Sequence, residues 1–189
     1  MPAPPGASYA VTTTVTNVVG TNLTMSGGDT ASTVVTIDNG STGNVDEAGV
    51  VWRARTPATR DLWNSVTYGN GVFVAVSSTS TNQSVMTSSD GITWTLRTAT
   101  TTSEWLSVTY GKGIFVAVAW SGSGSRVMTS PDGITWTGRT AAAANQWTSV
   151  TYGNSLFVAV AQSGSGNRVM TSPDGITWSI RTSAADSYW

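Results

Sequence analysis

Residues 147–188 read WTSVTYGNSLFVAVAQSGSGNRVMTSPDGITWSIRTSAADSY, and residues 105–146 carry nearly the same phrase. The two segments are identical at 30 of 42 aligned positions, and residues 63–104 form a more divergent third copy. Trp63, Trp105, Trp147 and Trp189 are therefore spaced by 42 residues. A fixed period in this range is typical of propellers, solenoids and arrays, in which each repeat buries its faces against the next one.

Each repeat predicts four short strands. In the third copy we expect them at 147–152, 156–161, 168–172 and 176–182. The second is continuously apolar, as in a strand covered on both faces, whereas the fourth alternates and should place Ile176, Trp178 and Ile180 on one face. Ser-Pro-Asp-Gly at 172–175 has proline and glycine where a tight turn requires them. The sequence thus predicts an all-β fold of β-propeller-type four-stranded blades.

The domain plan follows from the repeat boundaries. Blades 1, 2 and 3 are expected at 63–104, 105–146 and 147–188, with Trp189 opening a further unit. Trp52 lies 42 residues before Trp94, so 46–62 should hold the outer strand of an incomplete blade. The ring is therefore expected to be incomplete or shared. Either the natural chain continues, which we favour, or the N-terminal strands complete a blade, or several chains associate.

Residues 1–45 differ from the repeats in composition. They contain no Trp, Lys or Arg, and Thr/Val-rich strands are expected at 8–18, 21–26 and 32–38. Such strands can add to the edge of a neighbouring sheet. We therefore expect a β-rich N-terminal attachment arm that binds other structural proteins of the same assembly.

Composition excludes several classes of function. Charged residues make up 10% of the chain and the net charge is −1, with Lys112 and the arginines spread along the sequence, so nucleic-acid binding is not expected. The chain has no His and no Cys, which excludes thiol nucleophiles, imidazole bases and zinc sites, and no cofactor or metal is expected. The N-terminus does not resemble a signal peptide, and no apolar run approaches the roughly 20 residues of a membrane span.

A second recurring phrase is Ser-x-Asp-Gly-x-Thr-Trp, at 88–94, 130–136 and 172–178. It resembles the Asp-box of bacterial-neuraminidase-type β-propeller repeats, of the kind found in phage and bacterial surface proteins, although here one residue fewer separates Asp and Gly. The resemblance implies a structural role at the turn between the third and fourth strands. The expected turn braces are Asp90, Asp132 and Asp174. The recurring Arg97, Arg139 and Arg181 are likewise expected to be scaffold residues.

The positions that vary inside this constant frame are the candidate binding residues. Ser78, Trp120 and Gln162 share one position in the loop between the second and third strands, and Ser84, Arg126 and Arg168 share another. Sugar sites combine an aromatic platform with a few polar groups, so the predicted ligand contacts are Trp120, Arg126, Gln162 and Arg168. The structural alternative is a surface Trp that packs on a neighbouring blade or subunit.

The pattern favours a non-enzymatic structural or adhesive protein of a virion (a phage capsid or tail appendage) or of a cell-surface assembly, oligomeric or part of a larger particle. It would act on the virion or extracellular surface, where it recognises a host surface or glycans. A secreted carbohydrate-binding lectin is the alternative. A sialidase-like glycoside hydrolase is the weakest candidate, because the chain has only two glutamates, Glu47 and Glu104, and its repeated Tyr68, Tyr110 and Tyr152 are expected in the core.

Overall fold

The computed structural model describes residues 22–26, 34–38, 54–122 and 125–187. The chain divides into two compact units, 1–54 and 55–189. In the first unit, β1 (Asn22–Ser26) and β2 (Val34–Asp38) form a two-stranded antiparallel sheet. They correspond to the second and third expected strands of the arm. The first expected strand, Trp52 and Trp189 all lie outside the described residues, and 54–62 carry no strand.

The second unit contains three four-stranded antiparallel sheets, and within each sheet the strands pair in chain order. No helix occurs among the residues that the structure describes. Blade 1 consists of β3 (Trp63–Gly69), β4 (Val72–Ser77), β5 (Val85–Ser88) and β6 (Thr95–Arg97). Blade 2 consists of β7 (Trp105–Gly111), β8 (Ile114–Ala119), β9 (Val127–Ser130) and β10 (Thr137–Arg139). Blade 3 consists of β11 (Trp147–Gly153), β12 (Leu156–Ala161), β13 (Val169–Ser172) and β14 (Ser179–Arg181).

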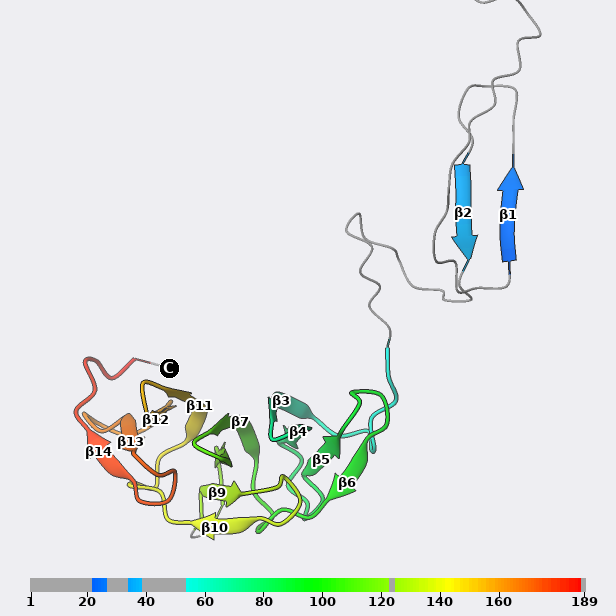
Figure 1. Cartoon of the computed structure of the whole chain (residues 1–189). Helices are drawn as coiled ribbons and strands as arrows, with labels where there is room; N and C mark the ends of the chain where they lie inside the picture. Colours follow the sequence, from blue (N-terminus) through cyan, green and yellow to red (C-terminus); the bar gives the residue numbers. More distant parts are fainter. Residues whose placement is uncertain (1–21, 27–33, 39–53, 123–124, 188–189) are drawn as a thin grey trace, which may run out of the picture. The chain divides into compact units, whose positions relative to one another are not determined.

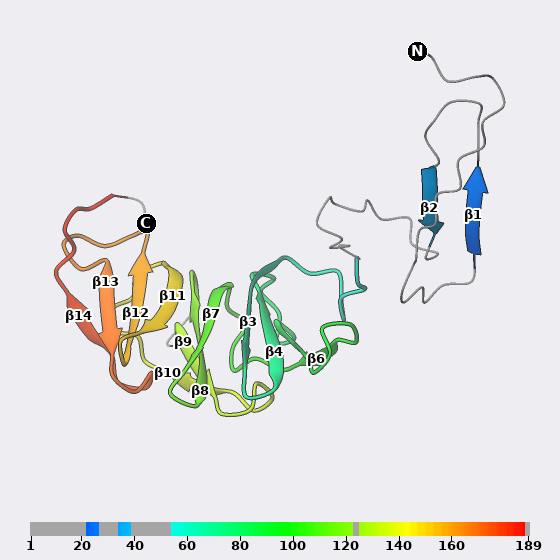
Figure 2. The ribbon, with the colours of Figure 1, turned by 45° about the horizontal axis from the view of Figure 1, so that its top comes forward.

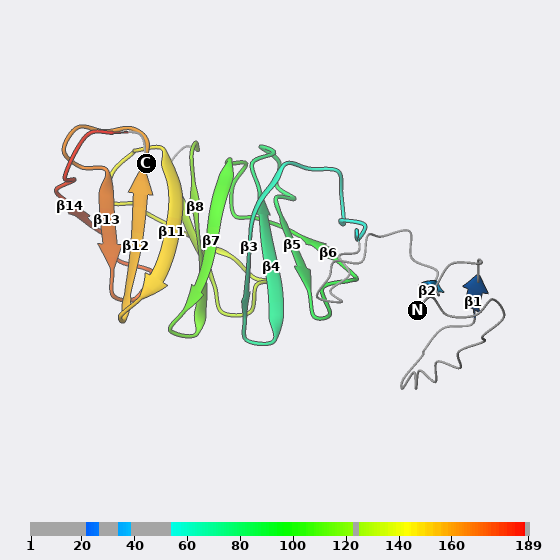
Figure 3. The ribbon, with the colours of Figure 1, turned by 90° about the horizontal axis from the view of Figure 1, so that it is seen from above.

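The three blades form an open arc (Figure 1). Their first strands β3, β7 and β11 lie along the inner edge of the arc, and their last strands β6, β10 and β14 lie along the outer edge. Figures 2 and 3 show the sheets standing side by side, so that each blade presents one face to the next. This is the predicted propeller architecture, and among the described residues the ring is not closed.

The core lies between the blades. Blade 1 contributes Val74, Val76 and Val85 to a cluster with Trp105 and Trp136 of blade 2. The junction of blades 2 and 3 repeats it with the equivalent residues 42 positions later: Val116, Val118, Val127, Trp147 and Trp178. We call the valine side of a blade its leading face and the tryptophan side its trailing face. Burial of apolar surface at these junctions is what stabilises a blade that could not fold alone.

The fourth strand is shorter than predicted. In blade 3 it spans Ser179–Arg181 rather than 176–182, because the backbone N–H groups of Ile176 and Thr177 donate to Asp174 instead of joining the ladder. A side-chain acceptor therefore competes with sheet pairing at this turn. The predicted common face is wrong for Ile176, which is exposed, whereas Trp178 is buried and Ile180 half-buried.

The turns between first and second strands have two central residues with positive φ, as hairpins of this length favour. They are Asn70–Gly71, Lys112–Gly113 and Asn154–Ser155. Ser155, at φ 62°, stands where the other two blades have glycine. Because a side chain in the left-handed region costs free energy, blade 3 carries a strained turn.

Candidate functional site

The turns between third and fourth strands, which carry the Ser-x-Asp-Gly phrase, have the same hydrogen bonds in all three blades. Oδ1 of Asp174 accepts the backbone N–H groups of Ile176 and Thr177, each at 2.8 Å, and the hydroxyl of Ser172 at 2.9 Å. The Ser172 hydroxyl in turn accepts the Gly175 N–H at 2.8 Å. Asp90 and Asp132 repeat this set. Each carboxylate is thus a turn brace with its acceptor oxygen occupied by the protein's own backbone.

These bonds also set the ionisation of the aspartates. The backbone N–H of Thr93, followed by that of Ile92 and the Ser88 hydroxyl, lowers the pKa of Asp90 to about 2. The pKa values of Asp132 and Asp174 are lowered for the same reason, first by the equivalent threonine N–H. Hydrogen bonds to the charged form favour ionisation, so the braces stay anionic at neutral pH.

The predicted binding positions lie at the other end of the blades. This loop end consists of the loops between second and third strands (78–84, 120–126, 162–168) and the connectors that lead into the next first strand. The first residue of each loop is held alike in every blade. The N–H at positions 78, 120 and 162 donates to the carbonyl of residues 62, 104 and 146, at 2.9–3.0 Å. Side chains at the variable position are therefore presented on an equivalent frame.

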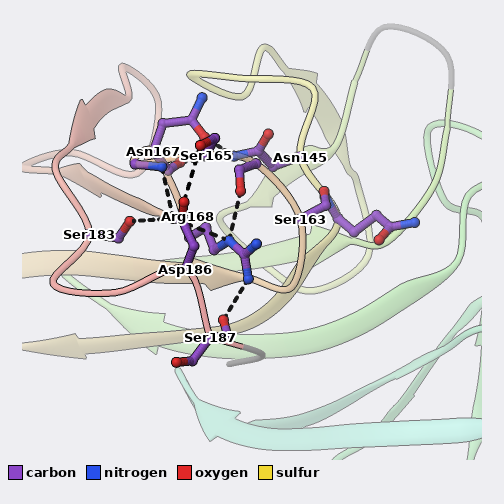
Figure 4. Close-up of polar contacts among 11 residues, drawn as sticks. Asn145, Ser163, Ser165, Asn167, Arg168, Ser183, Asp186 and Ser187 are labelled. Atoms are coloured by element: carbon purple, nitrogen blue, oxygen red, sulfur yellow. Dashed lines mark hydrogen bonds and ion pairs between the residues drawn. The ribbon is translucent and has the colours of Figure 1, made fainter.

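Arg126 and Arg168 fasten these loops. Arg126 donates to the carbonyls of Gly122, Trp120 and Asn145 at 3.4, 3.2 and 2.7 Å. Arg168 donates to the carbonyls of Gly164 at 2.8 Å and Ser187 at 2.6 Å (Figure 4). In blade 1 the smaller Ser84 donates its hydroxyl to Thr79 and Thr81. The varying residue at this position is thus a brace of its own loop in every blade.

Asp186 completes the cluster in blade 3, and sequence reasoning missed it. Its carboxylate accepts the Gly166 N–H at 2.8 Å and the Ser165 hydroxyl at 3.1 Å, and Oδ1 lies 3.6 Å from Arg168 Nε. The Gly166 N–H, the Ser165 hydroxyl and the Arg168 charge lower the pKa of Asp186. The available signal was that the third repeat has a carboxylate here, where the second has Ala144.

The structure connects the four predicted ligand contacts only in part. Arg126 meets the backbone of Trp120, and Asn145 links this loop to that of blade 3 through the carbonyl and side chain of Asn167, at 2.8 and 3.2 Å. The side chains of Trp120 and Gln162 are half-exposed. Beside Arg126 lies a hollow of about 260 Å³, lined by Gly122, Arg126, Thr140, Ala141, Ala143 and Ala144.

The remaining repeated arginines also contact their own blades. Nε of Arg97, Arg139 and Arg181 donates to Thr87, Thr129 and Thr171 at 2.9–3.0 Å. Within the described ranges, no group of three or more Asp or Glu side chains is placed to hold a metal ion. No helix in that same part of the chain is long and apolar enough to cross a membrane.

Comparison with known proteins supports the fold. No family model and no curated protein matches the chain. Among solved structures, it is similar to YCF48 bound to D1 peptide (TM-score 0.53, 16% identity, covering 69% of this chain and 44% of that one). It is also similar to virginiamycin B lyase from Staphylococcus aureus (0.59, 11%, 85% and 55%) and to YCF48 from Cyanidioschyzon merolae (0.50, 17%, 65% and 37%).

The chain thus spans roughly half or less of the length of these three proteins. At such identities the likeness concerns the β-propeller fold alone, and function has to be argued from the site itself.

Proposed function

We propose that the chain is a non-enzymatic structural and adhesive protein of a virion, such as a phage capsid or tail appendage, or of a cell-surface assembly. Its blades display the loop end to a host surface or its glycans, and the N-terminal arm binds other proteins of the assembly. The observation that carries the proposal is the loop end itself. Side chains that differ between repeats, Trp120 and Gln162, are held partly exposed by the same backbone hydrogen bond in each blade.

Glycan recognition is supported by the surroundings of Trp120. A sugar ring needs an apolar platform beside hydrogen-bonding groups. Here the carbonyl of Trp120, whose indole is half-exposed, accepts a hydrogen bond from Arg126. Arg126 also lines the hollow of about 260 Å³, together with Thr140 and apolar alanines. The same observation favours the alternative, a secreted carbohydrate-binding lectin, which differs in location rather than in the contact it makes.

A sialidase-like activity receives less support. Such an enzyme needs a carboxyl group free to donate or accept a proton beside the scissile bond. The oxygens of Asp90, Asp132 and Asp174 instead accept hydrogen bonds from their own turns, and Asp186 accepts those of the 163–166 loop. YCF48 has been solved bound to a peptide, so peptide ligands belong among the probes of the loop end.

The test is binding of the full chain to a glycan array and to intact host cells. We expect Trp120→Ala to weaken binding by about tenfold or more, as loss of an aromatic anchor does. The matched control is Ile176→Ala, which removes an exposed apolar side chain from the opposite end of the blades. Equal binding by both variants, or no binding by the wild-type chain, would contradict recognition through the loop end.

Location is tested separately. Antibody labelling of purified particles from the source culture should place the chain on the particle surface. Removal of residues 1–45 should abolish incorporation while leaving the blades folded. A chain found only free in the medium would instead favour the secreted lectin.

A further inference from the structure

The junction between neighbouring blades is built twice from the same parts. At each, a tyrosine of the trailing face lies over a glycine of the leading face. A Cβ added to Gly69 would stand 2.0 Å from the Tyr110 ring, and one added to Gly111 would stand 2.1 Å from Tyr152. Only glycine leaves room for the ring, so these positions are sockets. Beside each socket a serine hydroxyl accepts a valine N–H at 3.1 Å, Ser65 from Val108 and Ser107 from Val150.

Blade 1 carries one half of this junction uncovered. Val66 and Tyr68 are 59% and 57% exposed, whereas the equivalent Val108 and Val150 are 5% and 6% exposed. The same blade has a hollow of about 290 Å³, lined by Trp63, Asn64, Val66, Ala75, Met86 and Trp94, and also by Ser65, whose hydroxyl bonds to blade 2. In the part of the chain that the structure describes, nothing covers this apolar face.

The Asp-box glycines show what is missing there. A Cβ on Gly133 would stand 2.7 Å from Val74 of the preceding blade, and one on Gly175 would stand 2.8 Å from Val116. At Gly91 the nearest group is Phe73 of its own blade, at an ordinary 3.8 Å. Among the described residues, no preceding blade therefore places its leading-face valines against the trailing face of blade 1.

Blade 3 carries the complementary half. A Cβ on Gly153 would meet nothing within 4 Å, so this socket is empty, and Ser149 beside it is exposed. Val158, Val160 and Val169 are half-buried, whereas their equivalents in blade 2, Val116, Val118 and Val127, are fully buried.

We propose that the leading face of blade 3 docks on the trailing face of blade 1 of a second copy of this chain, with Tyr68 entering the socket at Gly153. The two faces carry the same residue types that already pair within the chain, including Arg181 on the leading face, where blades 1 and 2 have Arg97 and Arg139. Blade 3 therefore meets a surface equivalent to the ones blades 1 and 2 already meet. Because the two faces differ, the contact is head to tail, and copies extend the arc into a ring or a filament.

The test measures the mass of the full chain by sedimentation velocity across a wide range of concentrations. Gly153→Ala fills the socket, and Val66→Asp places an unpaired charge on the trailing face, which is costly only if that face is buried. Both sites are exposed in the single chain, so both variants should fold, as far-UV circular dichroism will verify. We expect the wild type to self-associate and each variant to raise the dissociation constant by about tenfold or more. Ile176→Ala, away from both faces, should associate like the wild type.

Mixing the two variants gives the decisive result. Gly153→Ala retains an intact trailing face and Val66→Asp an intact leading face, so an equimolar mixture should form a dimer that grows no further. A wild type that is monomeric at every concentration would overturn the proposal, as would association that persists in either variant. A mixture that stays monomeric would also overturn the proposal, because the two intact faces would then not bind each other.

Discussion

Replacing Gly111 with alanine should destabilise the protein strongly, although it adds only one methyl group. The new Cβ would lie 2.1 Å from the Tyr152 ring, whereas ordinary contact begins at 3.4 Å, so the ring must retreat by about 1.3 Å. Retreat is obstructed by Phe157, whose ring centroid lies 4.6 Å from that of Tyr152. We therefore expect a loss of about 3 kcal/mol in the free energy of unfolding, at the upper end of the usual cost of overpacking.

Urea denaturation followed by tryptophan fluorescence measures this loss. The matched control is Gly153→Ala, the same change at the same repeat position with nothing within 4 Å of the new atom. At dilute protein concentration it should change the free energy of unfolding by about 0.5 kcal/mol or less. Adding Tyr152→Ala to Gly111→Ala removes the ring that clashes, so the double variant should lose less than the sum of the single losses. Equal stability of the two glycine variants would refute the socket.

Three further outcomes follow from the blades. Trp105→Ala, which empties a fully buried site between blades, should cost about 3–5 kcal/mol, whereas Trp63→Ala at the half-buried equivalent should cost about half as much, in parallel urea titrations. Ser155→Gly should raise the free energy of unfolding by about 1 kcal/mol because it relieves a residue at positive φ; an unchanged urea midpoint would contradict the strain. Acid should weaken the fold. The pKa of Asp90 is lowered from 3.8 to about 2, so its contribution is complete above 3.8 and is lost as pH falls toward 2. The pKa of Asp132 is lowered in the same way, so Asp132→Asn should remove one such contribution and make the urea midpoint less dependent on pH.

The repeat period and its alternation predicted most of the fold. The second strand of blade 3 begins and ends where its apolar run does, at Leu156 and Ala161, because a continuously apolar strand has to lie between two other layers. The fourth strand was predicted too long, since a pattern of side chains does not show that Asp174 withdraws the N–H groups of Ile176 and Thr177 from the sheet.

The candidate site was less predictable. Arg126 and Arg168 were expected as ligand contacts because they vary in a loop. Both donate to backbone carbonyl groups, and the sequence does not show which carbonyl groups the folded loops bring within reach of an arginine. Tyr68 was expected in the core like Tyr110 and Tyr152. It is exposed because burial depends on a neighbouring blade, and none precedes blade 1 in the part of the chain that the structure describes.

The equivalence of the two blade junctions also affects how such a gene can change. Deleting one whole unit, such as 105–146, would bring the leading face of blade 1 against the trailing face of blade 3, and the buried valines, tryptophans, glycine and tyrosine of the lost junction would find their equivalents. Recombination between near-identical repeats can therefore change the number of blades, and each resulting chain can still fold. The loop end would gain or lose a display position each time, while the junctions that hold the blades together remain unchanged.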